Sequence, residues 1–228
     1  MNDHRRAGVL PVDFFARPAD RVAVELLGTL LVSTIRGVRC VGRIVETEAY
    51  LGEHDAASHG YRLRRSPRNA ALFGPPGNWY VYRSYGLHWC ANLVCQREGN
   101  AAAVLLRAVE PVEGLAAMRR RRRLLAGQEQ ILCAGPGRLC QALGISERLD
   151  GESMPGSSVH VLPGDPVPRG AVLATPRVGI TKAATALHRQ NLISYRRGDI
   201  MILDHHGLEA ASCECYGAER TLYQSVLG

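Results

Sequence analysis

The sequence predicts an α+β fold: a single domain in which helices pack around a curved antiparallel β-sheet that carries a protruding β-hairpin. Strand-like segments follow one another as hairpins instead of alternating with helices, which favours antiparallel pairing. The 228 residues are 46% hydrophobic and 21% charged, so one domain can bury a core without disulfides or metal. No apolar run is long enough to cross a membrane, and the first residues lack the pattern of a secretion signal.

The N-terminal part is expected to hold an arm, a helix and two strands. Residues 1–16 are predicted to form a flexible arm. A helix is predicted over 17–28, because a proline stands near its start and a glycine just past its end. Residues 29–50 are β-branched and apolar, and they predict two strands joined at Arg36-Gly37.

A long connection and a hairpin follow. The segment 51–78 is rich in Gly, Pro, Arg and Asn, and it shows little periodicity beyond a helical turn near 66–72. A connection of this length inside a compact domain is typically functional or disordered. The strand pattern resumes over 79–95 on both sides of Tyr85-Gly86, which we predict to be the tip of a β-hairpin.

The remaining elements complete a domain expected to end at residue 184, with 185–228 as a separate C-terminal segment. In chain order they are a buried strand over 101–111 that ends at Pro111, a basic helix over 112–127, a short helix after Gly135, a loop over 146–170 and a strand over 171–180.

Charge and cysteine usage restrict the partners and the compartment. The formal net charge is +7, and Lys182 is the only lysine among 28 basic residues. A basic surface rich in arginine indicates a polyanionic partner, since arginine binds phosphate in a bidentate manner. The seven cysteines are an odd number placed mostly in apolar segments, which favours reduced thiols and a cytoplasmic location, at the nucleoid if the source is bacterial.

The segment "GRIVETEAYLG", residues 42–52, places two carboxylates in an otherwise apolar strand. Alternation along a strand predicts that Ile44, Glu46, Glu48 and Tyr50 share one side. Partly buried neighbouring carboxylates suit general-base chemistry near neutral pH. Two surface acids that each pair with an arginine are the alternative, and spacing alone favours that alternative.

Three tyrosines stand in "YVYRSYG". Tyr80 and Tyr82 share a strand face and fit an ordinary core. Tyr85 lies at the predicted hairpin tip, where an exposed ring does nothing for folding and suits a partner surface. If that partner is duplex DNA, the ring could wedge between base pairs, whereas a ring folded back over its own hairpin fits the sequence equally well.

Six blocks in one order carry a family resemblance: "RIVETEAYLG", "DAASHG", "SPRNAALFGPPGNWYVYRSYGLHWCANLV", "AVLLRAVEPVEGL", "GPGRLCQALGI" and "PRVGITKAA". Together, from about residue 17 to 184, they resemble the alkyladenine (3-methyladenine) DNA glycosylase family, the type with a mixed α/β single domain instead of a helix-hairpin-helix. The resemblance implies a monofunctional glycosylase that hydrolyses the N-glycosidic bond of flipped alkylated or deaminated purines, of the 3-methyladenine, hypoxanthine and ethenoadenine type, in base-excision repair.

The resemblance also implies roles for individual residues. Glu48 matches the general base that activates water against C1′ of the sugar, and Arg107 matches the arginine that holds that water and carboxylate. Glu46 has no catalytic counterpart, and we interpret it as a structural partner of an arginine. Tyr50 and Tyr82 match the rings that sandwich an extruded base, and His59 matches the third wall, which contacts the base edge. Asn92 matches the position that crowds a guanine 2-amino group, and Tyr85 matches the intercalating side chain.

Contacts to the DNA backbone are expected from a basic loop and a glycine-rich turn. Gly135-Pro136-Gly137 could present backbone N–H groups to a phosphate or simply form a tight turn. The basic run 119–123 circles a whole helical turn, so we expect mostly a solvated face. The expected backbone contacts are Arg62, Arg64, Arg65, Arg68, Gly137 and Arg138.

No metal or cofactor is expected. The tail contains Asp204-His205-His206 and a Cys213/Cys215 pair, whose spacing matches no standard zinc site. Lys182 lies outside the catalytic blocks, and a strand-cutting lyase would need an amine, so a single-function glycosylase is favoured.

The expected partner is double-stranded DNA with damaged purines, bound by a monomer with no membrane association. After Ala184 the sequence departs from the aromatic segment and final strand that the family usually has. A catalytically inactive module that senses distorted duplexes is the alternative function. An RNA-binding domain is the third option, because basic and aromatic residues also suit single strands.

Overall fold

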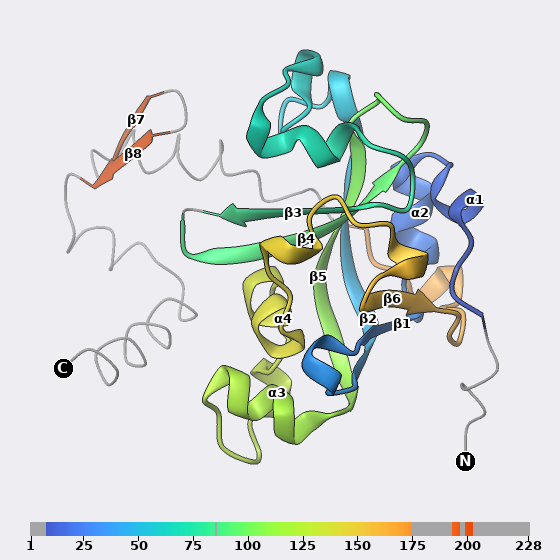
Figure 1. The fold of residues 1–228 in the computed structure, drawn as a ribbon, viewed down its shortest axis with the longest axis vertical. Coiled ribbons are helices and arrows are strands. Elements are labelled where there is room, and N and C mark those ends of the chain that lie inside the picture. The colour runs from blue at the N-terminus through green and yellow to red at the C-terminus, as the bar shows by residue number, and fades with distance from the viewer. Residues whose placement is uncertain (1–7, 85, 175–192, 197–198, 203–228) are drawn as a thin grey trace. The chain divides into compact units, whose positions relative to one another are not determined.

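The computed structural model describes residues 8–84, 86–174, 193–196 and 199–202 (Figure 1). The chain divides into two compact units, residues 1–174 and 175–228, and each is described by itself.

The first unit is built on one antiparallel sheet of six strands in the order β3-β4-β5-β2-β1-β6, curled like half a barrel (Figure 1). This confirms the predicted α+β class and its antiparallel sheet. The strands are β1 (Leu30–Ser33), β2 (Cys40–Tyr50), β3 (Trp79–Ser84), β4 (His88–Cys95), β5 (Ala102–Glu113) and β6 (Val159–Leu162).

Four α-helices and several short 3₁₀-helices surround the sheet in the described part of this unit. The α-helices are α1 (Val12–Phe15), α2 (Ala19–Glu25), α3 (Leu115–Arg122) and α4 (Pro136–Leu143). The 3₁₀ turns are η1 (Ile35–Gly37), η2 (Gly52–His54), η3 (Tyr61–Leu63), η4 (Pro67–Phe73), η5 (Glu129–Ile131), η6 (Glu147–Leu149), η7 (Met154–Gly156) and η8 (Arg169–Ala171).

The two faces of the sheet are covered by different sets of side chains. Helices α2 and α4 pack against β2, β4 and β5, and their apolar side chains form the main core with strand residues such as Trp79 and Leu106. The Trp79 indole also donates a hydrogen bond of 3.0 Å to the Val159 carbonyl. A smaller cluster gathers Leu72, Tyr80 and their neighbours against other strand positions. This second face carries the candidate site described below.

Strand β2 departs from regular pairing with β5 around Glu46, the first of its two carboxylates. The register with β5 is interrupted between Ile44 and Thr47. Ile44 is fully buried in the main core, and Thr47 donates a hydrogen bond to the Ala23 carbonyl of α2. Glu46 and Glu48 instead both reach Arg107 of β5. The predicted shared side is therefore wrong for Ile44, because the irregular pairing separates it from the two carboxylates.

Several predicted elements need correction. Residues 8–16 of the expected flexible arm are packed, since Phe15 of α1 is fully buried and Leu10 bonds to Val161. Strand β5 continues through Pro111, whose ring is tolerated where the register to β2 shifts beside Gly42. The loop expected over 146–170 contains β6, which pairs with β1.

The C-terminal region is only partly described. Residues 172–174 form no strand, and the rest of the strand expected over 171–180 lies outside the described residues. In the second unit, β7 (Ile193–Arg196) and β8 (Asp199–Ile202) form an antiparallel pair.

Candidate active site

The centre of the candidate site is an arginine between two carboxylates. Arg107 lies on β5 and donates from Nη1 to Oε2 of Glu48 at 2.6 Å and from Nε to Oε1 of Glu46 at 2.8 Å. The Glu48 side chain is only 14% exposed, whereas that of Glu46 is 54% exposed. Burial lowers the pKa of Arg107, but the hydrogen bonds and negative charges of the two glutamates outweigh burial and raise it. The guanidinium therefore stays charged beside a shielded carboxylate.

Aromatic rings line the same face of the sheet. Tyr80 and Tyr82 alternate with core residues of β3, and their rings stack with centroids 5.4 Å apart. His59 comes from the segment between η2 and η3 and meets Tyr82 edge-on at 4.5 Å. Burial is the main cause that raises the pKa of Tyr82, and the neighbouring Cys90 and Tyr50 raise it further. The Tyr82 phenol is therefore neutral, and it can stack on a purine without a charge of its own.

A short hydrogen bond ties His59 to the strand. Its Nδ1 lies 2.6 Å from the hydroxyl of Tyr80. Burial lowers the pKa of His59 and raises that of Tyr80, so both groups are neutral at pH 7. Tyr80 is only 3% exposed, so its hydroxyl holds the His59 ring in a fixed position.

Removing that hydrogen bond should leave the orientation of the His59 ring less firmly fixed. We expect Tyr80→Phe to slow base release about 5-fold, the kinetic equivalent of one ordinary hydrogen bond. Tyr61→Phe, in the same loop, is the control and should leave the rate unchanged. Single-turnover rates with a hypoxanthine-containing duplex measure both, and equal rates for the two variants would show that Tyr80 does not orient His59.

The long loop that carries His59 is ordered around a buried asparagine. Asn69 donates to the carbonyls of His59 and Arg64, both at 2.9 Å, and its Oδ1 accepts from the backbone of Ser66 at 2.7 Å. Gly60 packs so closely that a Cβ would overlap that of Ala101. The loop therefore forms an ordered wall of the site. Sequence reasoning missed Asn69, although a serine followed three residues later by a polar side chain is a capping signal.

Tyr50 and Asn92 lie on the same face with different exposure. Tyr50 ends β2, is half-buried and is close enough to Tyr82 to affect its pKa. Asn92 is 3% exposed, and its amide donates to the Tyr80 carbonyl at 3.0 Å. Cys90, which sequence reasoning also missed, is buried and hydrogen-bonded to the Tyr82 hydroxyl. The expected contacts of Tyr50 and Asn92 with a base remain predictions.

The turn of the predicted hairpin is present, with Leu87 N–H bonded to the Ser84 carbonyl at 2.9 Å. Tyr85 itself lies outside the described residues. Leu87, two residues further along the chain, is 59% exposed.

The expected DNA-backbone residues differ in their surroundings. All four loop arginines are exposed; Arg62 lies over the Tyr61 ring and Arg65 over that of Phe73. Gly137 packs so tightly that a Cβ would lie 2.8 Å from Cβ of His88. This close approach supplies a packing reason for the glycine. Arg138 is half-buried, and its Nη1 lies 3.4 Å from the Ala134 carbonyl.

The basic run of α3 is more structural than expected. Arg119 pairs with Glu129 at 2.6 Å, Arg121 donates to the Ala142 carbonyl at 2.9 Å, and Arg122 reaches Gln141. These half-buried arginines tie α3 to its neighbours, so the prediction of a mostly solvated face is wrong for them.

The cysteines of the described residues, 40, 90, 95, 133 and 140, are buried and unpaired with one another. Across the described ranges no group of three or more His, Cys, Asp or Glu side chains is arranged to hold a metal ion. The 204–206 and 213–215 motifs and Lys182 lie outside those ranges. In the part of the chain that the structure describes, no helix has the length and apolar character needed to cross a membrane.

Comparison with known proteins covers the part of the chain that holds these residues. Residues 13–195 match the family described as Methylpurine-DNA glycosylase (MPG). Proteins named "Putative 3-methyladenine DNA glycosylase" are similar over most of their length. One from Myxococcus xanthus (strain DK1622) is 49% identical over 77% of this chain and 84% of its own. One from Rhodopseudomonas palustris (strain HaA2) is 50% identical over 75% and 80%, and one from Chlorobaculum tepidum is 42% identical over 79% and 86%. The chain belongs to the methylpurine-DNA glycosylase family.

Proposed function

We propose that the protein is a 3-methyladenine DNA glycosylase that releases alkylated or deaminated purines from duplex DNA by hydrolysis of the N-glycosidic bond. The observation that carries this proposal is the shielded Glu48 carboxylate, bonded to Arg107 and placed on the same sheet face as the His59 and Tyr82 rings. Family membership supports the same activity.

Each part of the site has a use in that reaction. A base inside a duplex is out of reach until it is flipped, which costs a few kcal/mol. Stacking against Tyr50 and Tyr82, with His59 against the edge of the base, offsets that cost. Glu48 then accepts a proton from a water molecule whose oxygen adds to C1′. The C1′–N bond breaks with its electron pair, which leaves on the purine. The carboxylate also stabilises the positive charge that develops on the sugar.

This mechanism ends at an abasic site, because it uses water as the nucleophile and no amine. We assign the protein to the cytoplasm, where it acts as a monomer on double-stranded DNA without membrane association. The exposed loop arginines are suited to the phosphate backbone. We further assign the catalytic domain to residues 17–184 and regard 185–228 as a divergent segment.

A base-release assay tests the proposal. The purified protein should release free base from duplexes with 3-methyladenine, hypoxanthine or ethenoadenine and leave the strand uncut. A chelator should not change the rates. Tight binding to lesion duplex with no release from any of the three would favour the inactive damage sensor, and preference for single-stranded RNA would favour an RNA-binding domain.

The hairpin is proposed to fill the space that a flipped base leaves. We expect Tyr85→Ser to slow base release about 10-fold, because base stacking on an aromatic ring contributes roughly 1–3 kcal/mol. Undamaged DNA should still bind with the same salt dependence, since phosphate contacts dominate that affinity. Tyr61→Ser is a control outside the hairpin. Loss of all DNA binding by Tyr85→Ser would contradict a wedge role.

A further inference from the structure

Glu46 has a place in the site that its family resemblance does not explain. It bonds Nε of Arg107, while Glu48 bonds Nη1 of the same guanidinium. The guanidinium is planar and its donors form a rigid fork, so a partner on Nε also fixes the direction in which Nη1 donates. The Arg107 side chain is 35% exposed, which means that packing alone leaves it room to move.

We propose that Glu46 is a positioning residue for base release, which acts through Arg107 to hold the Glu48 carboxylate in place. The inference rests on the proposed function.

A purely structural role for Glu46 fits the observations less well. Its side chain is 54% exposed, and exposed ion pairs contribute roughly 0–1 kcal/mol to stability. The fold therefore gains little from the pair. The backbone nevertheless departs from regular pairing on both sides of Glu46, the residue that reaches Nε of Arg107.

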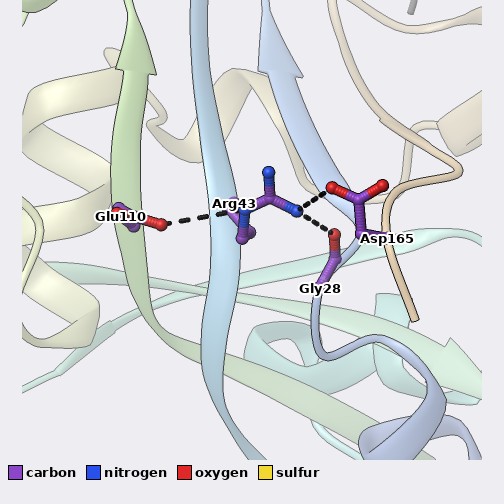
Figure 2. A network of polar contacts seen from close by, with 4 residues as sticks. All are labelled: Gly28, Arg43, Glu110 and Asp165. Carbon is purple, nitrogen blue, oxygen red and sulfur yellow. Dashed lines mark hydrogen bonds and ion pairs between the residues drawn. The ribbon is translucent and has the colours of Figure 1, made fainter. Parts of the chain in front are cut away.

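The same two strands hold a comparable cluster three residues along each strand from Glu46 and Arg107 (Figure 2). Arg43 of β2 lies 3.7 Å from Glu110 of β5 and 3.1 Å from Asp165, and it also donates to the Gly28 carbonyl. Glu110 is 65% exposed, and Figure 2 shows it reaching Arg43 from the neighbouring strand. Glu110 is therefore a matched control: an exposed glutamate on an arginine shared with a second carboxylate, with no link to Glu48.

The experiment compares Glu46→Gln, Glu46→Leu and Glu110→Gln in single-turnover release from a hypoxanthine duplex. Glu46→Leu removes both the charge and the acceptor, and we expect roughly a 10-fold slower release, since small displacements of a catalytic group are costly. Glu46→Gln keeps an acceptor for Nε and should fall in between. Glu110→Gln should stay within about 2-fold of the unmodified protein, as should the affinity of every variant for the lesion duplex.

A double-mutant cycle with Arg107→Gln separates positioning from structure. If Glu46 acts through Arg107, adding Glu46→Leu to Arg107→Gln slows release by less than about 2-fold more. Independent, multiplying effects would overturn the inference, and so would unchanged release by Glu46→Leu alone. Thermal unfolding of each variant verifies that it is folded. If the unmodified protein releases no base, the proposed function is wrong. If the unmodified protein releases base and Glu46→Leu releases it at the same rate, only the inference about Glu46 is wrong.

Discussion

Glu48→Gln abolishes base release while the lesion duplex still binds. The amide cannot accept the proton of the attacking water and carries no charge to stabilise the sugar, so we expect a rate at least about 10³-fold lower. The amide keeps the size of the carboxylate, and its oxygen can still accept the hydrogen bond of Arg107, which lies at 2.6 Å in the native site. Single-turnover release and equilibrium binding of the same hypoxanthine duplex measure the two properties.

Glu53→Gln is the matched control for this prediction. Glu53 lies in η2, shortly after β2, and its side chain is 46% exposed beside His54. Its rate should equal that of the unmodified protein. Release by Glu48→Gln at a rate close to the control would show that Glu48 takes no part in the reaction.

Tyr82→Ala weakens both the site and the fold around it. Its ring contacts those of His59 and Tyr80, and its hydroxyl bonds Cys90. Truncation removes a stacking wall worth roughly 1–3 kcal/mol per base, so we expect release to slow by about 10- to 100-fold. The same truncation leaves a cavity against a small apolar cluster and should lower the free energy of unfolding by about 2 kcal/mol or more.

Tyr82→Phe separates these effects from loss of the hydroxyl. It keeps the ring and loses only the hydrogen bond to Cys90, so release should fall by less than about 5-fold. Denaturant unfolding of both variants measures stability. A rate for Tyr82→Ala equal to that of Tyr82→Phe would contradict stacking on this ring.

Local patterns predicted most of the sheet. Alternation and turn residues correctly indicated β1 to β4 and the hairpin between β3 and β4, because those pairings are local in sequence. Strand β6 has four residues between Gly- and Ser-rich turns, and it exists through pairing with the distant β1. The packed position of α1 likewise depends on contacts with distant strands that composition does not reveal.

The site was predictable only in part. Alternation placed Tyr80 and Tyr82 on one face and Glu46 with Glu48 on another strand, and the structure brings both pairs to the same side of the sheet. The irregular pairing that separates Ile44 from the carboxylates leaves no local signal. The sharing of Arg107 by two glutamates is a cross-strand geometry, which spacing within one strand does not encode.

The structure of the Glu48→Gln variant bound to a duplex with one hypoxanthine tests the proposed mechanism. We expect an extruded purine between the rings of residues 50 and 82, with residue 59 against its edge, side chain 48 beside C1′ and a water molecule between that side chain and C1′. A lesion that stays paired inside the helix, or a sugar bound on a different surface from side chain 48, would contradict it.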